Sequence, residues 1–74
     1  MADVLDIEID PARLRKARED AGLSQSEAGD LCGVSFQQIS HIECGKKQPS
    51  SEVLIRMCAA YKVDISEITR ATAA

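Results

Sequence analysis

The fold is decided by residues 24–50, which read SQSEAGDLCGVSFQQISHIECGKKQPS. Ser24 and Ser35 each begin an S-x-x-E/Q pattern, the capping box in which a hydroxyl and a longer side chain satisfy free amides at a helix start. Gly33 and Gly45 follow at the distances where short helices end, because glycine adopts the left-handed conformation of a helix C-terminus at little steric cost. The stretch therefore predicts two short helices joined by a tight turn.

The second of these two helices, which we call the recognition helix, has an unusual surface. Only Ile39 and Ile42 are spaced to face a core. Its other positions carry amides, a hydroxyl and an imidazole, on Gln37, Gln38, Ser40 and His41. Base edges in the DNA major groove offer both donors and acceptors, and a glutamine amide pairs with adenine through two hydrogen bonds. Because the second helix of a helix-turn-helix enters that groove, the pattern predicts duplex DNA binding.

Three more helices are predicted around this pair, so the expected fold is all-α with five helices. Asp10 and Pro11 open the first of them, as a capping carboxylate followed by a proline that fits the first helical turn. Ser50 or Ser51 caps a later helix, whose apolar stripe at i, i+3, i+4 and i+7 is made by Leu54, Met57, Cys58 and Tyr61. Asp64 begins a last short helix.

The first ten residues, MADVLDIEID, are typical of a strand rather than a helix. Apolar and acidic residues alternate in them, with an apolar set made by Leu5, Ile7 and Ile9, and this is the period of a half-buried strand. No other strand is predicted, so the two expected arrangements are an arm docked on the helices and pairing with the same strand of a second chain. We therefore divide the chain into an arm or dimerisation strand over 1–10, a helix-turn-helix domain over 11–69 and a frayed tail over 70–74.

Charge and cysteine content narrow the class of protein. The 74 residues carry a formal net charge of -3, but four of the acids lie in the first ten residues, and from residue 11 onward nine bases face eight acids. The odd number of cysteines, with no signal peptide, predicts a cytoplasmic protein with free thiols at Cys32, Cys44 and Cys58.

No apolar run approaches the roughly 20 residues of a membrane span. Neither catalysis nor a metal cofactor is expected, and a thiol or metal sensor that combines these cysteines with His41 is a minor alternative.

Several short motifs together identify a family. They are Leu23-Ser24-Gln25, Gly33-Val34-Ser35, Ile39 with Ile42-Glu43, and Gly45-Lys46 followed by Pro49-Ser50. With them the chain resembles, from about Leu14 to Ile68, the lambda-repressor/Cro-like helix-turn-helix family, also called the XRE family. The resemblance implies a five-helix bundle and sequence-specific binding of double-stranded DNA, usually as a dimer.

The resemblance also implies roles for individual residues. The base-contacting positions are Ser35, Phe36, Gln37, Gln38 and His41. The phosphate-contacting positions are Gln25, Ser40, Lys46, Lys47 and Arg18. Gln25 is further expected to brace the recognition helix, and Arg18 to form an ion pair with Glu43.

Three residues depart from what these patterns favour. Phe36 stands where polar residues are frequent in the family, and its ring suits the methyl group of thymine. Leu31 is apolar where a polar residue is common, and we expect a contact surface there. Gly29 lies inside a predicted helix, where glycine costs up to about 1 kcal/mol relative to alanine, so we expect another backbone to approach it closely.

The sequence thus predicts a small transcriptional regulator, a Cro-like repressor of a phage or mobile element, that binds a short palindromic operator as a homodimer. We expect no separate dimerisation domain in a chain of this size. The dimer interface is therefore expected to use Ile55, Ile65 and Ile68, with the strand residues Leu5, Ile7 and Ile9 as a second choice. The alternative function is a protein-interaction module, such as an antitoxin that neutralises a toxin or a partner of the polymerase.

Overall fold

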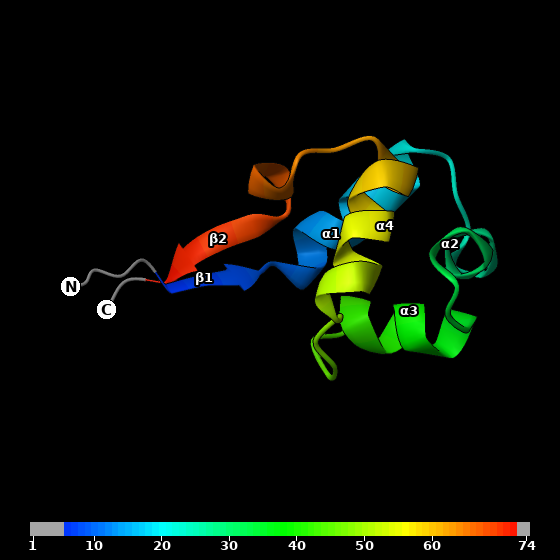
Figure 1. Ribbon diagram of the computed structural model, residues 1–74, viewed down its shortest axis with the longest axis horizontal. Coiled ribbons are helices and arrows are strands. Elements are labelled where there is room, and N and C mark those ends of the chain that lie inside the picture. Colours follow the sequence, from blue (N-terminus) through cyan, green and yellow to red (C-terminus); the bar gives the residue numbers. More distant parts are fainter. Residues whose placement is uncertain (1–5, 73–74) are drawn as a thin grey trace.

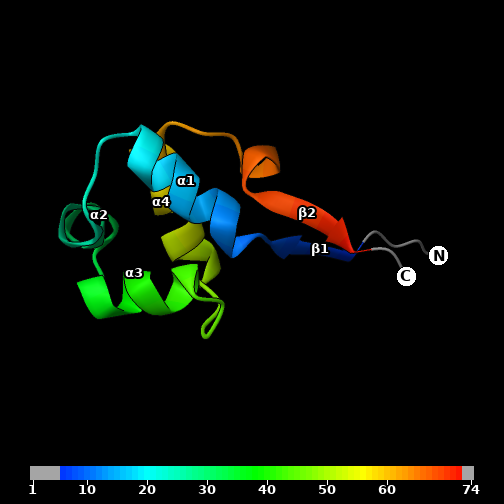
Figure 2. The same cartoon turned by 180° about the vertical axis from the view of Figure 1, so that it is seen from behind.

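A helical bundle and a two-stranded ribbon make up the computed structural model, which describes residues 6–72 and the side chains of residues 8–71 (Figure 1). The elements in chain order are β1 (Asp6–Ile9), α1 (Pro11–Asp20), α2 (Gln25–Cys32), α3 (Phe36–Glu43), α4 (Ser51–Tyr61), the 3-10 turn η1 (Ile65–Glu67) and β2 (Thr69–Thr72). The ribbon leaves the bundle on the side opposite α2, and the view from behind shows the same arrangement (Figure 2).

The helices begin where the capping residues predict. Ser24 and Glu27 form a complete capping box, in which the Glu27 amide donates to the Ser24 hydroxyl over 3.0 Å and the Ser24 amide donates to the Glu27 carboxylate over 2.8 Å. The hydrogen bond that the Ser24 amide donates to the carboxylate holds the pKa of the Glu27 carboxyl below its usual range. Ser35 accepts from the Gln38 amide over 3.1 Å, but no return bond from the Gln38 side chain is found among the described residues, so this second box is half formed. Ser50, one of two expected caps, begins α4.

The core is aliphatic and draws on all four helices. Its buried residues are Leu14, Ala17, Ala28, Cys32, Ile39, Ile42, Met57, Tyr61 and Ile68. The inward positions predicted for the recognition helix, Ile39 and Ile42, are confirmed, with exposures of 0% and 1%. Met57 and Tyr61 confirm the stripe on α4, whereas Leu54 and Cys58 are only partly buried.

The predicted fifth helix is wrong. Asp64 does cap a helical turn, but η1 spans only Ile65–Glu67 and the chain then extends into β2. Ile68 follows the turn and is fully buried in the core, so it is not the dimer contact that we expected. The described helices are therefore four in number, followed by a single 3-10 turn.

The predicted N-terminal strand is confirmed, but its partner was not foreseen. β1 pairs antiparallel with β2 of the same chain, and residues 70–72 of β2 were expected to belong to a frayed tail. Glu8 lies opposite Arg70, and their side chains form an ion pair of 2.9 Å. This pairing satisfies backbone groups that a lone strand would leave open, and neither of our two predicted arrangements included it. Of the proposed strand contacts, Ile9 packs on the core, Ile7 is described in its backbone alone, and Leu5 lies outside the described residues.

No helix within residues 6–72 is long and apolar enough to cross a membrane.

Candidate nucleic-acid interface

A close backbone contact fixes the turn between α2 and α3. The Val34 amide donates to the Gly29 carbonyl over 2.9 Å, and a Cβ placed on Gly29 would lie only 2.6 Å from the Val34 carbonyl oxygen. The same Cβ would lie 3.3 Å from the amide nitrogen of Phe36, the first residue of α3. The predicted close approach is therefore confirmed, and glycine at this position sets how α3 sits on α2.

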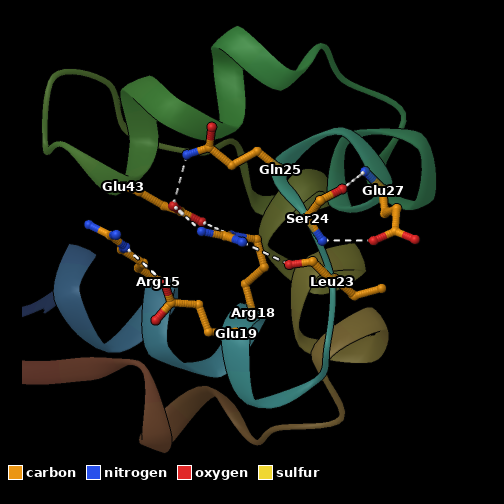
Figure 3. Close-up of polar contacts among 8 residues, drawn as sticks. All are labelled: Arg15, Arg18, Glu19, Leu23, Ser24, Gln25, Glu27 and Glu43. Carbon is orange, nitrogen blue, oxygen red and sulfur yellow. Dashed lines mark hydrogen bonds and ion pairs between the residues drawn. The ribbon is translucent and has the colours of Figure 1, made fainter.

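A buried ion pair joins α3 to the first helix (Figure 3). Arg18 Nε donates to Glu43 Oε2 over 2.6 Å and Arg18 Nη2 donates to Glu43 Oε1 over 3.1 Å. The side chains are 9% and 3% exposed. The hydrogen bond to Glu43 raises the pKa of Arg18. The ion pair implied by the family resemblance is thus confirmed, and both of its charges are withdrawn from the surface.

Two further contacts complete this junction. Arg18 Nη1 donates to the carbonyl oxygen of Leu23 over 2.7 Å, in the segment before α2. Gln25 Nε2 donates to Glu43 Oε1 over 3.2 Å, which confirms that Gln25 braces the recognition helix. Because Nε, Nη1 and Nη2 of Arg18 all donate inside the protein, the expected phosphate contact at Arg18 is wrong. The sequence did not identify Leu23, since only its backbone takes part.

The opposite face of α3 is open to solvent. Phe36, Gln37 and His41 are exposed, whereas Gln38 and Ser40 are partly buried. Ser35 is exposed as well, and its hydroxyl caps the helix. The candidate base-contacting residues therefore lie together on one eight-residue helix and the residue before it, on surface that the core does not use.

Free positive charge is concentrated next to this face. Most basic side chains outside it are already in ion pairs, which are Arg13–Asp10, Arg15–Glu19, Lys16–Asp20, Arg56–Glu52 and Arg70–Glu8. Lys46 and Lys47, in the loop after α3, are exposed and have no carboxylate within 4.0 Å among the side chains of residues 8–71; Lys62 shares this property. Since the one acid of α3, Glu43, is neutralised by Arg18, the end of α3 presents positive charge in a chain whose net charge is negative.

Arg56 also supports the helix-turn-helix, and the sequence analysis did not single it out. Its Nη1 lies 3.4 Å from the carbonyl oxygen of Cys32, the last residue of α2, and its Nη2 pairs with Glu52 over 2.7 Å. A cation near the C-terminal end of a helix interacts favourably with the helix dipole. The i, i+4 spacing of Glu52 and Arg56 is the signal that points to a held side chain.

Two of the three cysteines, Cys32 and Cys58, lie in or against the core. Cys32 is fully buried and Cys58 partly so, and burial raises the pKa of both thiols, which disfavours the reactive thiolate. No group of three or more potential metal ligands occurs among the described residues. His41 and Cys44 are both exposed on or next to α3.

A helix-turn-helix family model matches residues 14–68, from α1 through η1. The chain belongs to the lambda-repressor-like helix-turn-helix family. It is 40% identical over 55 residues to the transcriptional regulator ClgR of Mycobacterium tuberculosis, a match that covers 74% of this chain and 49% of ClgR. It is 36% identical over 55 residues to the regulator PuuR of Escherichia coli, covering 74% of this chain and 30% of PuuR.

Among solved structures, the P22 c2 repressor bound to a synthetic operator matches with a TM-score of 0.73 and 25% identity, over 80% of this chain and 89% of the repressor. The match to family members thus covers the helical bundle. The chain spans half or less of the length of the curated relatives named above.

Proposed function

We propose that this protein is a transcriptional regulator that binds a specific double-stranded DNA operator and represses transcription by occupying it, in the manner of Cro. The observation that carries the proposal is the two-sided α3, which keeps Ile39, Ile42 and Glu43 inside and leaves Gln37 and His41 in solvent. A glutamine amide and an imidazole supply the donors and acceptors that base edges require. The family, and the operator bound by the P22 c2 repressor, support the same function.

The residues divide into two groups by their chemistry. Ser35, Phe36, Gln37, Gln38 and His41 are proposed to contact bases. Gln25, Ser40, Lys46 and Lys47 are proposed to contact phosphates, which position a protein on the duplex without reading its sequence. Lys46 and Lys47, which have no carboxylate within 4.0 Å among the side chains of residues 8–71, suit the second role because uncompensated positive charge releases condensed counterions from DNA.

We further propose that the protein binds as a homodimer on a palindromic site, with two α3 helices about 34 Å apart in successive major grooves. Ile55 and Ile65 are 68% and 49% exposed, so both offer apolar surface to a partner. Ile65 also lines a groove of about 540 Å³ together with Ile9 and Leu54. Gln48, in the loop after α3, forms another part of its wall, so a second copy seated there would lie beside the end of α3. The action is proposed to be cytoplasmic.

Operator binding is tested by selecting duplexes from a random pool and measuring their affinity by fluorescence anisotropy between about 50 and 200 mM salt. We expect the selected duplex to bind at least about 10³-fold more tightly than a scrambled one. Gln37→Ala should reduce that ratio, whereas Glu52→Ala on α4 should not. Equal, weak binding to all duplexes would contradict the proposal and would favour the alternative of a protein partner.

Dimerisation is tested by analytical ultracentrifugation of the Ile55→Asp, Ile65→Asp double variant. Both side chains are exposed, so the fold should survive while the apolar contact is lost. Leu31→Asp is the matched control on α2, at an apolar residue that is 57% exposed and where the sequence also predicted a contact surface; a dimer formed through Ile55 and Ile65 should persist in this variant. A double variant that dimerises as tightly as the original protein would rule out this interface.

A further inference from the structure

Phe36 is the one large apolar side chain that α3 leaves in solvent among the described residues. It is 50% exposed, although the other large apolar residues of the helix, Ile39 and Ile42, are buried. A half-exposed aromatic ring on a surface otherwise made of amides, a hydroxyl and an imidazole is not needed for the core. The ring of Phe36 is therefore available to contact an apolar group of the DNA that α3 binds.

The backbone places Phe36 at the start of α3, close to α2. Phe36 is the first residue of α3, directly after the Ser35 cap, and its amide nitrogen lies against Gly29 of α2. The first turn of α3 thus packs so closely on α2 that a Cβ on Gly29 would lie 3.3 Å from the Phe36 amide nitrogen. Because the N-terminal residues of a recognition helix are those that meet base edges, the ring of Phe36 lies at a base-reading position.

Only one apolar group is exposed in the major groove. Adenine, guanine and cytosine present donors and acceptors there, whereas thymine adds a methyl group on C5. A phenyl ring satisfies no donor or acceptor, so facing any of the other bases it would leave their polar groups without a partner. The thymine methyl group is the one major-groove feature with which the phenyl ring makes a favourable apolar contact.

We propose that Phe36 is a specificity-determining residue that reads the C5-methyl group of a thymine in each half of the operator. The inference rests on the proposed function, since it requires operator binding. Gln37 and His41 read polar edges nearby, while Phe36 selects the methyl group. A protein that reads its site in this way discriminates thymine from uracil, which differs by that methyl group alone.

The test replaces single thymines of the selected operator by deoxyuridine and measures affinity by anisotropy. Removing one buried methyl group from contact costs about 0.8 kcal/mol, so we expect about a fourfold loss at one thymine in each half-site and smaller losses elsewhere. With Phe36→Ala this uracil penalty should disappear, because the ring that contacts the methyl group is gone. Phe36→Leu keeps an apolar side chain and should retain part of the penalty.

A matched control separates a contact from a general effect of uracil on the duplex. Leu31→Ala removes a similarly exposed apolar side chain from α2, and the full penalty should persist in it. Circular dichroism of each variant verifies that the fold is kept. A penalty that is absent at every thymine, or equal in the original protein and in Phe36→Ala, would overturn the inference while operator binding itself stands. Absence of any preferred duplex would overturn both this inference and the proposed function.

Discussion

The two faces of α3 differ in almost every physical respect. The inner face places Ile39 and Ile42 in the core and Glu43 in a buried ion pair with Arg18. The outer face leaves Gln37 and His41 in solvent, without a hydrogen bond among the described residues that would hold either side chain. One helix of eight residues thus carries both the stability of the bundle and its proposed recognition surface.

Because the two faces of α3 differ in this way, substitutions that affect folding stability and substitutions that affect DNA specificity are expected at different residues. Substitutions on the inner face are expected to change the free energy of unfolding, because they open cavities or leave a buried charge alone. Substitutions on the outer face are expected to change DNA affinity and to leave stability alone, because the side chains of Gln37 and His41 are exposed and are not part of the core. The following predictions test that separation, beginning with the largest effect.

Glu43→Ala should lower the free energy of unfolding by about 3–5 kcal/mol, since it leaves Arg18 buried without its carboxylate. Urea denaturation followed by circular dichroism measures the change. The control is Glu52→Ala, which removes an exposed partner of Arg56 and should cost no more than about 1 kcal/mol. A loss at Glu43 that is as small as the control would mean that the ion pair does not anchor α3.

Ile39→Ala and Gln37→Ala contrast the two faces directly. Ile39 is fully buried, so its truncation should cost about 2–5 kcal/mol of stability. Gln37→Ala should stay within about 0.5 kcal/mol of the original stability, yet it should weaken operator binding by about 1–3 kcal/mol. Denaturation and anisotropy on the same preparations give both values, and a destabilised Gln37 variant with unchanged affinity would reverse the assignment of the faces.

Gly29→Ala should destabilise the protein by about 1–3 kcal/mol, because the added Cβ meets the Val34 carbonyl oxygen at 2.6 Å. The methyl group forces α2 and α3 apart, so operator affinity should fall as well. Thermal denaturation and anisotropy are the measurements. A variant with unchanged stability and affinity would show that the turn can adjust, and that Gly29 does not set the position of α3.

Lys62→Gly should have the smallest effect and the opposite sign. Lys62 ends α4 in the left-handed region, with φ of 57°, where a side chain costs roughly 1–2 kcal/mol and glycine is favoured. After the larger chain entropy lost by glycine, a gain of about 0.5–1 kcal/mol is expected. Operator affinity should be unchanged, since Lys62 lies at the end of α4 away from the recognition face; a large loss of affinity would assign this lysine to the DNA contact.

The helical part of the fold could be predicted from local chemistry. Capping residues such as Asp10, Ser24 and Ser50 act on the amides next to them, so their patterns place helix starts without knowledge of tertiary structure. The spacing of Ile39 and Ile42 likewise fixed the inner face of α3. These signals are local, and the structure bears them out.

The remaining features depend on contacts between distant segments. Nothing in Thr69–Thr72 alternates as β1 does, so β2 could not be recognised before its partner was placed beside it. Asp64 and Glu67 form a real capping box, yet the turn ends after three residues because Ile68 turns into the core and the chain joins the ribbon. Arg18 was assigned both an ion pair and a phosphate, and only its burial decides between them.

We place the DNA-binding surface on the outer face of α3, and NMR of the isotope-labelled protein with the selected operator duplex would locate that surface residue by residue. We expect the largest changes in amide chemical shift over Phe36–Glu43 and at Gln25, Lys46 and Lys47, with small changes at the 3-10 turn. If the amides of α3 stayed unchanged while another surface shifted, the assignment of α3 as the recognition helix would be wrong.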